Sequence, residues 1–405
     1  MPRNRPVRRD RAARRLISIN RAGGPRNHNR RKIDARIDRL SASCKTFRRA
    51  GESVISRKFI PIAALLTIVA AAALWLTLRT PEVYVQGTYV FGTRVQLAIY
   101  GVPLERAQQD ADAVFAHFRS MHRELHAWQP SEVTRLNQHI AAGEPFQASP
   151  ELAAIIRAAR ALSLQTQGLF DPGIGRLIRL WGFQADQFDA KPPSRDSVLR
   201  EQSLHASIAD LTISDSGVVT SENRAVALDL GGYAKGWSLD EAAAILRQRG
   251  VRNALVDVGG NLLALGSKGA IPWRVGIQDP RKAGTLATLE LRDGEAIGTS
   301  GDYERFYRSG GVRYCHIIDP RSGFPATQSE SVTVLVRPGP HAGALSDGAS
   351  KAPFVAGPAL AMSLASGIGV DSLLLVDAQG RVWDSAPMAE RVRFTDPALR
   401  PARLE

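Results

Sequence analysis

Sulfur and aromatic side chains are scarce in this sequence of 405 residues. It has two cysteines and four methionines, and Phe, Trp and Tyr together make up 6% of the residues. Two cysteines are too few for the disulfide framework of a small secreted domain. Cys44 and Cys315 lie on opposite sides of a long apolar segment, so we expect them not to pair with each other.

Acidic residues are also scarce at the N-terminal end. Residues 1–58 contain 19 Lys and Arg residues but only 4 Asp and Glu residues, a local charge of 19 − 4 = +15 against +14 for the whole chain. The remaining residues therefore sum to −1. Such a segment cannot bury a hydrophobic core, so we expect a basic, disordered tail. A basic tail can bind nucleic acid, or it can lie in the cytoplasm against anionic lipid. The apolar segment that follows favours the interpretation that the tail lies in the cytoplasm against lipid.

Charged residues are absent from Phe59 to Leu78. This run of 20 residues is flanked by basic residues on both sides, and it has the length of a helix that crosses a hydrocarbon core. A cleaved signal peptide would have a shorter apolar region nearer the start. We therefore expect an uncleaved, single-pass anchor at 59–78 in the cytoplasmic (inner) membrane. Because the basic excess precedes it, residues 79–405 are expected in the periplasm or outside the cell.

The remaining chain mixes strand-like and helix-like patterns without a repeat of fixed period. Strands are expected at 93–100 and 254–258, and helices at 103–125 and 150–166. The polar stretch 186–203 is expected to be an exposed connection between two subdomains. These patterns predict the α+β fold class.

Paired glycines mark the strongest candidate for a ligand site, Asp229-Leu-Gly-Gly-Tyr-Ala-Lys-Gly236. A strand is expected before it, at 226–230, and a helix after it, at 237–249. A strand that turns through glycines into a helix leaves backbone N–H groups where a phosphate can bind. Tight packing alone produces the same pattern. A second pair, Gly259-Gly260, follows the strand expected at 254–258.

Several ordered motifs resemble those of the FAD:protein FMN transferase family, the ApbE-like proteins. Besides the first glycine motif, they are Val258-Gly-Gly-Asn261, Gly298-Thr-Ser-Gly-Asp-Tyr-Glu304 and His316-Ile-Ile-Asp-Pro-Arg-Ser-Gly323. Shorter matches are Phe91-Gly-Thr93, Trp128, Phe170-Asp-Pro172 and Leu180-Trp-Gly-Phe183. The resemblance covers roughly residues 85–385 in family order, and ordered motifs are far more specific than any one of them.

The resemblance implies an ApbE-like catalytic domain of two packed α/β subdomains behind the N-terminal transmembrane helix. Its implied activity transfers FMN from the substrate FAD, through a phosphoester bond, to a Thr or Ser of a separate extracytoplasmic flavoprotein, and releases AMP. The alternatives are an FAD-binding protein and an FAD pyrophosphatase that releases FMN and AMP. A nucleic-acid-binding or lipid-binding module built on the basic tail is a third class, which leaves residues 85–385 unused.

The resemblance also assigns contacts to the flavin nucleotide. The matched positions are Phe91, Trp128, Leu169, Phe170, Asp171, Asp229, Lys235, Gly259, Gly260, Ile297, Thr299 and Ser300. Trp128 alternatively packs in the core, and Lys235 is alternatively an exposed helix cation. Asp302 is expected to orient Thr299 and Ser300.

His316 is the candidate general base toward the incoming hydroxyl, because an imidazole titrates near neutral pH. Asp319 is expected to hold the Pro-Arg-Ser-Gly turn that follows it. Cys315, beside His316, is a candidate thiol nucleophile, but a small core residue is the preferred interpretation.

Magnesium binding is where the sequence departs from the family pattern. The resemblance places Mg²⁺ against the carbonyl of Gly232 and the side chains of an Asp and a Thr. The Asp is present as Asp347, but Lys351 replaces the Thr, and Ala344 replaces an upstream acidic residue. Mg²⁺ is a hard cation that prefers oxygen ligands, and the expected site lacks two of its side-chain oxygens. We expect Lys351 to act electrostatically beside Asp347 with weak or absent Mg²⁺ dependence; alternatively, it is a solvated i,i+4 partner of Asp347.

Overall fold

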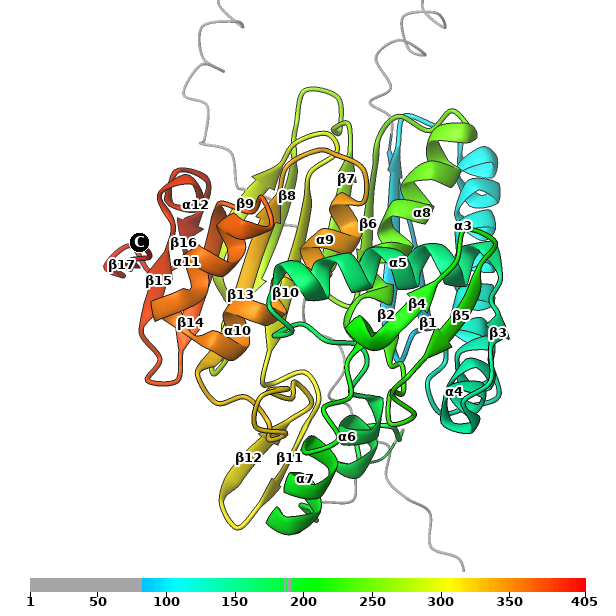
Figure 1. Ribbon diagram of the computed structural model, residues 1–405. Coiled ribbons are helices and arrows are strands. Elements are labelled where there is room, and N and C mark those ends of the chain that lie inside the picture. The colour runs from blue at the N-terminus through cyan, green and yellow to red at the C-terminus, as the bar shows by residue number, and fades with distance from the viewer. Residues whose placement is uncertain (1–81, 186, 188–190) are drawn as a thin grey trace, which may run out of the picture. The chain divides into compact units, whose positions relative to one another are not determined.

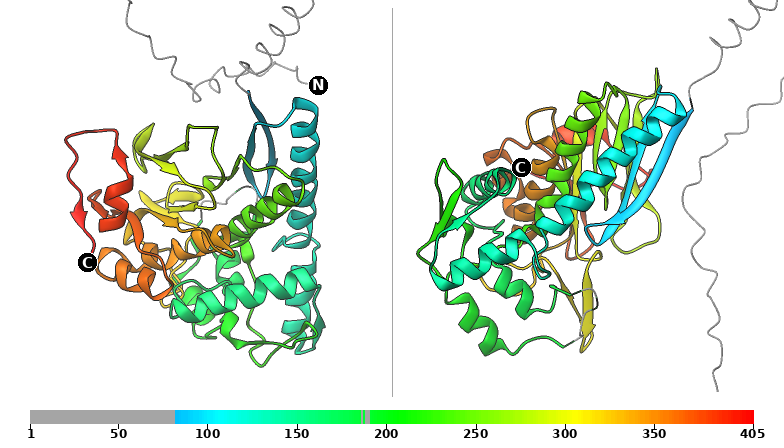
Figure 2. Two further views of the ribbon diagram at one scale, coloured as in Figure 1. Left: turned by 90° about the horizontal axis from the view of Figure 1, so that it is seen from above. Right: turned by 90° about the vertical axis from the view of Figure 1, so that its right-hand side faces the viewer.

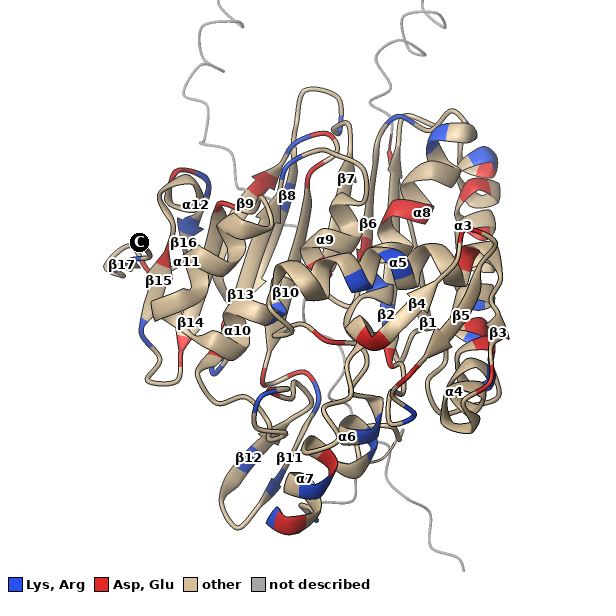
Figure 3. Ribbon diagram, viewed as in Figure 1, with Lys and Arg blue, Asp and Glu red and all other residues tan. Residues whose placement is uncertain are grey.

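The computed structural model describes residues 82–185, 187 and 191–405. Thr80–Glu405 forms one compact unit (Figure 1). The basic tail predicted at 1–58 and the anchor predicted at 59–78 lie outside the described residues. Within the described ranges, no helix combines the length and the apolar composition that a membrane span requires. Acidic and basic residues are interspersed over these ranges (Figure 3), as expected if the basic excess belongs to the first 58 residues.

A nine-stranded sheet forms the centre of this unit (Figure 1). Every neighbouring pair is antiparallel except the last, which is parallel. In spatial order the strands are β1 (Val83–Val90), β2 (Thr93–Tyr100), β6 (Ala254–Val258), β7 (Asn261–Leu265), β10 (Ala296–Gly301), β13 (Ser329–Val336), β14 (Ser372–Asp377), β15 (Val382–Asp384) and β17 (Ala402–Arg403).

Different layers cover the two faces of this sheet (Figures 1 and 2). Helices α3 (Leu104–Glu124), α8 (Ala234–Gln248), α9 (Ala342–Ala349), α10 (Lys351–Ala356) and α11 (Pro358–Gly367) pack on one face. A three-stranded sheet of β8 (Trp273–Gln278), β9 (Thr285–Leu291) and β16 (Arg393–Phe394), with helix α12 (Ala386–Arg391), packs on the other. Alternate residues of a strand point to opposite faces. In β10, accordingly, Ala296 joins the helical core and Ile297 joins the core between the sheets.

A second group of elements lies beside the helical layer. It comprises α4 (Glu132–Ala142), α5 (Pro150–Gln165), the short helix η2 (Ile208–Asp210) and a small sheet of β3 (Phe146–Gln147), β4 (Leu211–Ile213) and β5 (Val218–Ser221). Its apolar residues belong to the same core as the helices on the large sheet. The two predicted subdomains therefore share one hydrophobic core.

The third group packs around Trp181 and Phe183 in a small separate core. It contains α6 (Gly175–Leu180), α7 (Arg195–Gln202) and a hairpin of β11 (Phe306–Ser309) and β12 (Val312–Cys315). Helix α7 lies within the stretch 186–203 that was predicted as an exposed connection. Ser194 caps this helix through a hydrogen bond from the Ser197 N–H at 3.2 Å, so polar composition there reflected a cap and an exposed helix face.

Most sequence-predicted elements are confirmed, but the strand expected at 226–230 is wrong. Only Ala227 forms an isolated bridge there, to Ile174. The Asn137 side chain takes the place of a neighbouring strand, since it donates to the Leu228 carbonyl at 2.9 Å and accepts from the Leu228 N–H at 2.7 Å. Buried backbone groups need such partners. Helix α8 begins at Ala234, three residues earlier than predicted.

Cys315 is a core residue. Its side chain is 2% exposed, and the thiol lies 3.5 Å from the Ala326 carbonyl and 3.6 Å from the Ile317 carbonyl. Burial raises its pKa to about 12. The thiolate is the reactive form, so this cysteine cannot act as a nucleophile near neutral pH.

We therefore expect Cys315 to resist alkylation in the folded protein. In a Cys44→Ser chain at pH 8, iodoacetamide should label Cys315 about a thousandfold more slowly than a free thiol, because the pKa is raised to about 12 and the thiolate fraction falls about tenfold per unit of pKa. Labelling should reach the free-thiol rate in denaturant. Fast labelling without denaturant, followed by intact mass, would contradict the burial.

Candidate functional site

The first glycine pair lies in a short helical turn, η3 (Leu230–Gly232), directly before α8. Asp229 caps this turn by accepting from the Gly231 N–H at 3.0 Å, and its second oxygen accepts from Gln184 at 2.9 Å. The Lys235 ammonium donates back to the Gly231 carbonyl at 3.1 Å. Asp229 therefore shapes the turn, and Lys235 lies over it.

Two glycines allow α8 and α9 to cross in close contact. A methyl group on Gly236 would lie 2.3 Å from the Gly343 carbonyl oxygen and 2.6 Å from the Asp347 Cβ. Asp240 of α8 also caps α9, because its carboxylate accepts from the N–H groups of Gly343 and Ala344, both at 2.8 Å. This crossing brings Lys235 next to Asp347, which is 112 residues away in the sequence.

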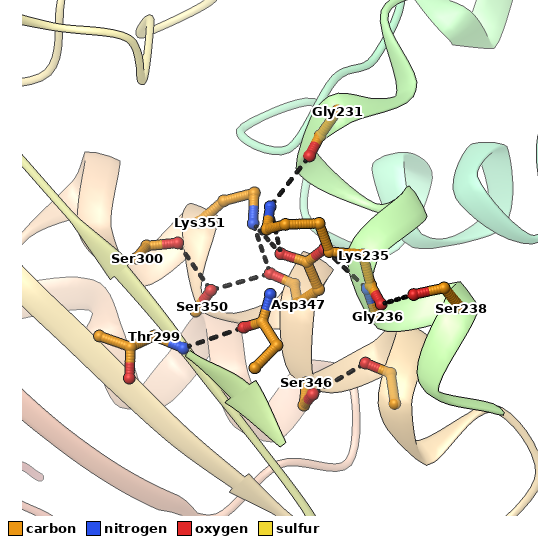
Figure 4. Close-up of polar contacts among 12 residues, drawn as sticks. Gly231, Lys235, Gly236, Ser238, Thr299, Ser300, Ser346, Asp347, Ser350 and Lys351 are labelled. Carbon is orange, nitrogen blue, oxygen red and sulfur yellow. Dashed lines mark hydrogen bonds and ion pairs between the residues drawn. The ribbon is translucent and has the colours of Figure 1, made fainter. Parts of the chain in front are cut away.

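Asp347 is the centre of the polar cluster in Figure 4. It is 1% exposed. One carboxylate oxygen accepts from Lys351 at 2.7 Å and lies 3.7 Å from the Lys235 ammonium, and the other accepts from the Gly236 N–H at 3.0 Å. The Lys351 ammonium also donates to the Asp347 main-chain carbonyl at 2.7 Å. Asp347 thus holds two lysines from two helices.

These contacts keep Asp347 ionised. Burial alone would raise its pKa, but Lys235, Lys351 and the hydrogen bonds hold the pKa below its usual value. Burial lowers the pKa of Lys351, and Asp347 opposes that shift. A hydroxyl chain extends the cluster, since Ser350 donates to the Asp347 carbonyl at 2.8 Å and lies 2.7 Å from the Ser300 hydroxyl.

His316 follows β12 and faces these lysines. Its Nδ1 lies 3.2 Å from the Arg305 carbonyl. A carbonyl only accepts, so Nδ1 carries the proton and Nε2 has a free lone pair. Burial, together with the positive charges of Arg305, Lys235 and Lys351, lowers the pKa of His316 to about 3. The imidazole is therefore neutral at pH 7, and the expectation that it titrates near neutral pH is wrong. Its unprotonated Nε2 can accept a hydrogen bond from an incoming hydroxyl.

Aromatic side chains lie at two sides of the cluster. Phe170 is buried 5.7 Å from the Tyr233 ring, and a methyl on Gly232 would lie 3.9 Å from Phe170 and 2.8 Å from the Lys351 Cε. Trp128 is half-buried, with the His126 ring at 4.4 Å and the Arg305 guanidinium at 5.8 Å. Arg305 thus connects Trp128 to His316.

The structure therefore brings many predicted site residues together. Asp347 is surrounded by Phe170, Asp229, Gly232, Lys235, Ser300, His316 and Lys351, with Trp128 linked through Arg305. Phe91 lies at the β1–β2 turn with φ +55°, and its ring packs 5.8 Å from Phe118 and 5.7 Å from His122. Leu169 is buried in the main core.

Other predicted contacts have structural roles. Gly259 and Gly260 form the two-residue turn between β6 and β7 with φ values of +60° and +87°, which a type I′ hairpin requires. Ile297 packs between the two sheets, and the Thr299 hydroxyl lies 2.9 Å from that of Thr333. Both side chains lie on the sheet face away from Asp347, because the intervening Gly298 faces Ser346. Direct side-chain contact to a ligand beside Asp347 is therefore not supported for either.

The acidic residues around these motifs divide in the same way. Asp171 accepts from the N–H groups of Gly173 at 2.7 Å and Ile208 at 2.9 Å, which joins two loops. The expectation that Asp302 orients Thr299 and Ser300 is wrong, because its carboxylate pairs with Arg281 at 2.6 Å and Arg313 at 3.1 Å. Asp319 holds its turn as expected, accepting from the Arg321 N–H at 2.9 Å.

Some important residues were missed. Arg305 positions His316, Gly236 permits the helix crossing, and Asp240 caps α9. Gly236 belongs to the motif quoted from the sequence, so its type was visible but its partner was not. Asp240 is a single acidic residue on a helix, and no local pattern identifies its partner 103 residues away.

The residues around Asp347 do not fit the expected Mg²⁺ site. Mg²⁺ needs near-octahedral oxygen coordination at about 2.0–2.1 Å. Here N–H donors already contact both carboxylate oxygens of Asp347 and its main-chain oxygen. Among the residues that the structure describes, no group of three or more His, Cys, Asp or Glu side chains could hold a metal ion.

Comparisons with known proteins agree with this geometry. Residues 91–374 match the ApbE family. An FAD:protein FMN transferase of Rhodobacter capsulatus is 41% identical over 325 residues, and the match covers 79% of this chain and 60% of that protein. The chain thus spans less than two thirds of that relative. One from Treponema pallidum is 30% identical, with 77% and 90% of the two chains covered.

A solved structure shows the same fold. The crystal structure of the ApbE protein from Thermotoga maritima matches with a TM-score of 0.69 and 30% identity, covering 77% of this chain and 100% of that one. The Vibrio cholerae flavin transferase ApbE matches with a TM-score of 0.67 and 26% identity, covering 77% and 99% of the two chains. The chain therefore belongs to the ApbE family.

Proposed function

We propose that this protein is an FAD:protein FMN transferase, which moves FMN from FAD to a Thr or Ser of another protein. The observation that carries the proposal is the cluster itself. A neutral imidazole, His316, faces two lysine ammonium groups beside a glycine turn, so a proton acceptor and the charges that bind a pyrophosphate share one site. The curated relatives named above carry this activity in their names.

The proposed reaction is a phosphoryl transfer. The acceptor hydroxyl oxygen attacks the FMN-side phosphorus of FAD, and a new phosphoester bond forms. The bond from that phosphorus to the bridging oxygen breaks, and AMP leaves with this oxygen. The hydroxyl proton passes to Nε2 of His316. Such reactions depend chiefly on positioning and on neutralisation of charge.

Each part of the site has a role in this proposal. Lys235 and Lys351 face the pyrophosphate, and the lack of a side chain on Gly232 leaves room for the Lys351 stem beside the turn. Phe170 and Trp128 offer apolar or aromatic surface for the flavin. Arg305 fixes the ring of His316 through its carbonyl.

The partner and the location are also part of the proposal. We infer an extracytoplasmic acceptor flavoprotein with a Thr or Ser attachment motif. The 20-residue apolar run at 59–78, after a strongly basic tail, supports a single-pass anchor in the inner membrane. Residues 79–405 would then work on the outer side of that membrane.

Mass spectrometry tests the transferase activity directly. Residues 80–405 are mixed with FAD and an acceptor domain, and a copy of the acceptor with its attachment Thr changed to Ala serves as the control. We expect the acceptor mass to increase by the mass of FMN less one water, with one AMP released, and the control acceptor to stay unchanged. FMN and AMP without labelling would identify a pyrophosphatase instead, and intact FAD would identify a binding protein.

A further inference from the structure

The Lys351 side chain occupies a fixed position inside the cluster. It is 14% exposed, so it is not a solvated surface lysine. Its ammonium bridges the Asp347 carboxylate and main-chain carbonyl, both at 2.7 Å. Its aliphatic stem lies against the glycine turn, since a methyl group on Gly232 would be 2.8 Å from its Cε. The stem and the head group are therefore both held in place.

We propose that the Lys351 ammonium is the resident cation of this site, and that the flavin nucleotide binds to the pair Lys235 and Lys351 without a divalent metal ion. The proposal rests on the proposed function, because it names how that site neutralises its substrate. It assigns a binding role to a lysine that stands where the family pattern has a Thr.

The local charges support this arrangement. Lys235, Lys351 and Asp347 leave an excess of one positive charge, and His316 is neutral. Glu304 also interacts electrostatically with Lys235, and Arg305 adds a positive charge near His316. Because Lys351 contacts Asp347 at 2.7 Å and Lys235 lies 3.7 Å away, Lys235 is the more available of the two ammonium groups for an anionic ligand. A divalent ion at Asp347 would have to displace the Lys351 ammonium and then lie close to Lys235. Lys235 lies 3.7 Å from the Asp347 carboxylate, and like charges this close repel strongly when they are partly buried.

Lysine in place of a metal has a chemical consequence. Lys351 provides a point charge with three N–H donors, whereas Mg²⁺ would add ligand exchange and bound water. Pyrophosphate oxygens accept hydrogen bonds from an ammonium directly. The chain's nucleotide binding should therefore be insensitive to chelators.

The test measures FAD affinity by quenching of flavin fluorescence, in EDTA and in excess Mg²⁺, for wild type, Lys351→Thr and Lys351→Met. We expect wild type to bind equally well in both. Both variants should bind about 10- to 100-fold more weakly in EDTA, as expected for loss of a hydrogen bond to a charged group. Mg²⁺ should restore Lys351→Thr, because the variant frees Asp347 and adds a hydroxyl oxygen. Lys282→Thr, on an exposed loop, serves as the matched control and should bind as wild type.

Direct titration with Mn²⁺, read by electron paramagnetic resonance, separates this inference from the proposed function. We expect no Mn²⁺ binding to wild type and binding to Lys351→Thr. Stoichiometric Mn²⁺ binding to wild type would overturn the inference, as would unchanged FAD affinity of Lys351→Met in EDTA. Wild type that binds no FAD in either buffer would overturn the proposed function, while the Mn²⁺ titration would still decide the role of Lys351. Urea unfolding of each variant confirms that the protein is folded.

Discussion

Replacing Gly236 with Ala is expected to lower the free energy of unfolding by about 3 kcal/mol or more, because overpacking against backbone has few routes of relief. The added methyl would lie 2.3 Å from the Gly343 carbonyl oxygen and 2.9 Å from the Ala344 Cα. Neither atom can move without separating α8 from α9. Urea unfolding, followed by circular dichroism, gives the change in midpoint at constant slope.

Gly367→Ala is the matched control for this substitution. Gly367 is also a helical glycine, at the end of α11, but a methyl group there meets no atom within 4 Å. We expect its stability to be unchanged or raised by about 0.4–1 kcal/mol, as is usual for a compatible Gly→Ala change. Equal effects of the two substitutions would refute the close crossing of the helices.

The Gly236→Ala substitution should also weaken ligand binding. Gly236 donates its N–H to Asp347 at 3.0 Å, and it directly follows Lys235. A wider crossing would separate Lys235 from Asp347 and weaken the binding of FAD. A Gly236→Ala protein that unfolds earlier but binds FAD normally would show that the crossing serves stability alone.

Local patterns in the sequence were sufficient for most of the fold. Strands at 93–100 and 254–258 and the long helices have bounds close to those of β2, β6, α3 and α5. Alternating or 3.6-residue periodicity is a local signal, so it survives without tertiary information. The strand predicted at 226–230 is wrong because one side chain, Asn137, can satisfy the backbone hydrogen bonds of an extended apolar segment in place of a neighbouring strand.

The two glycine pairs have different roles, although both match family motifs in the sequence. Gly231-Gly232 lies in the site, whereas Gly259-Gly260 is explained by its hairpin. Two residues of this kind between alternating strands are a known hairpin signal, so this outcome was available from the sequence. The two faces of β10 could also be predicted from alternation, which separates Ile297 and Thr299 from Ser300.

The centre of the site depends on contacts between distant segments. Lys235 and Asp347 come together only because α8 and α9 cross at glycines, and His316 reaches them from a hairpin of a third group of elements. The spacing of these residues in the sequence does not predict that their side chains lie close together. The resemblance to a family indicated that the residues belong together, and the structure supplies the reason.

Changing His316 to Gln should lower the rate of FMN transfer about 10²- to 10⁴-fold, the usual contribution of a positioned general base. The amide of Gln can keep a hydrogen bond to the Arg305 carbonyl, but it cannot accept the proton of the acceptor hydroxyl. FAD affinity should change little, because the neutral imidazole contributes no charge to binding. Rapid mixing with FAD and acceptor, followed by the mass of the acceptor, measures the rate.

His139→Gln is the matched control. Its Nδ1 lies 3.1 Å from the Pro145 carbonyl, so it makes the same kind of contact as His316. The His139 side chain is 42% exposed on α4, where no ligand contact is expected. Transfer should stay within about twofold of wild type, as for most surface changes. A similar loss in both variants, or full activity of His316→Gln, would remove His316 from the reaction.

The pH dependence gives a second and independent reading of His316. The dependence of kcat/KM on pH reports the ionisations of the free enzyme. Because the pKa of His316 is lowered to about 3, the base stays unprotonated and kcat/KM should show no acid limb near pH 6.5. The unfolded chain binds this proton near pH 6.5, so linkage predicts that stability falls as the pH drops from there toward 3. An acid limb at pH 6–7 in folded wild type, absent in His316→Gln, would contradict this prediction. It would mean that Lys235, Lys351 and Arg305 do not lower the pKa of His316.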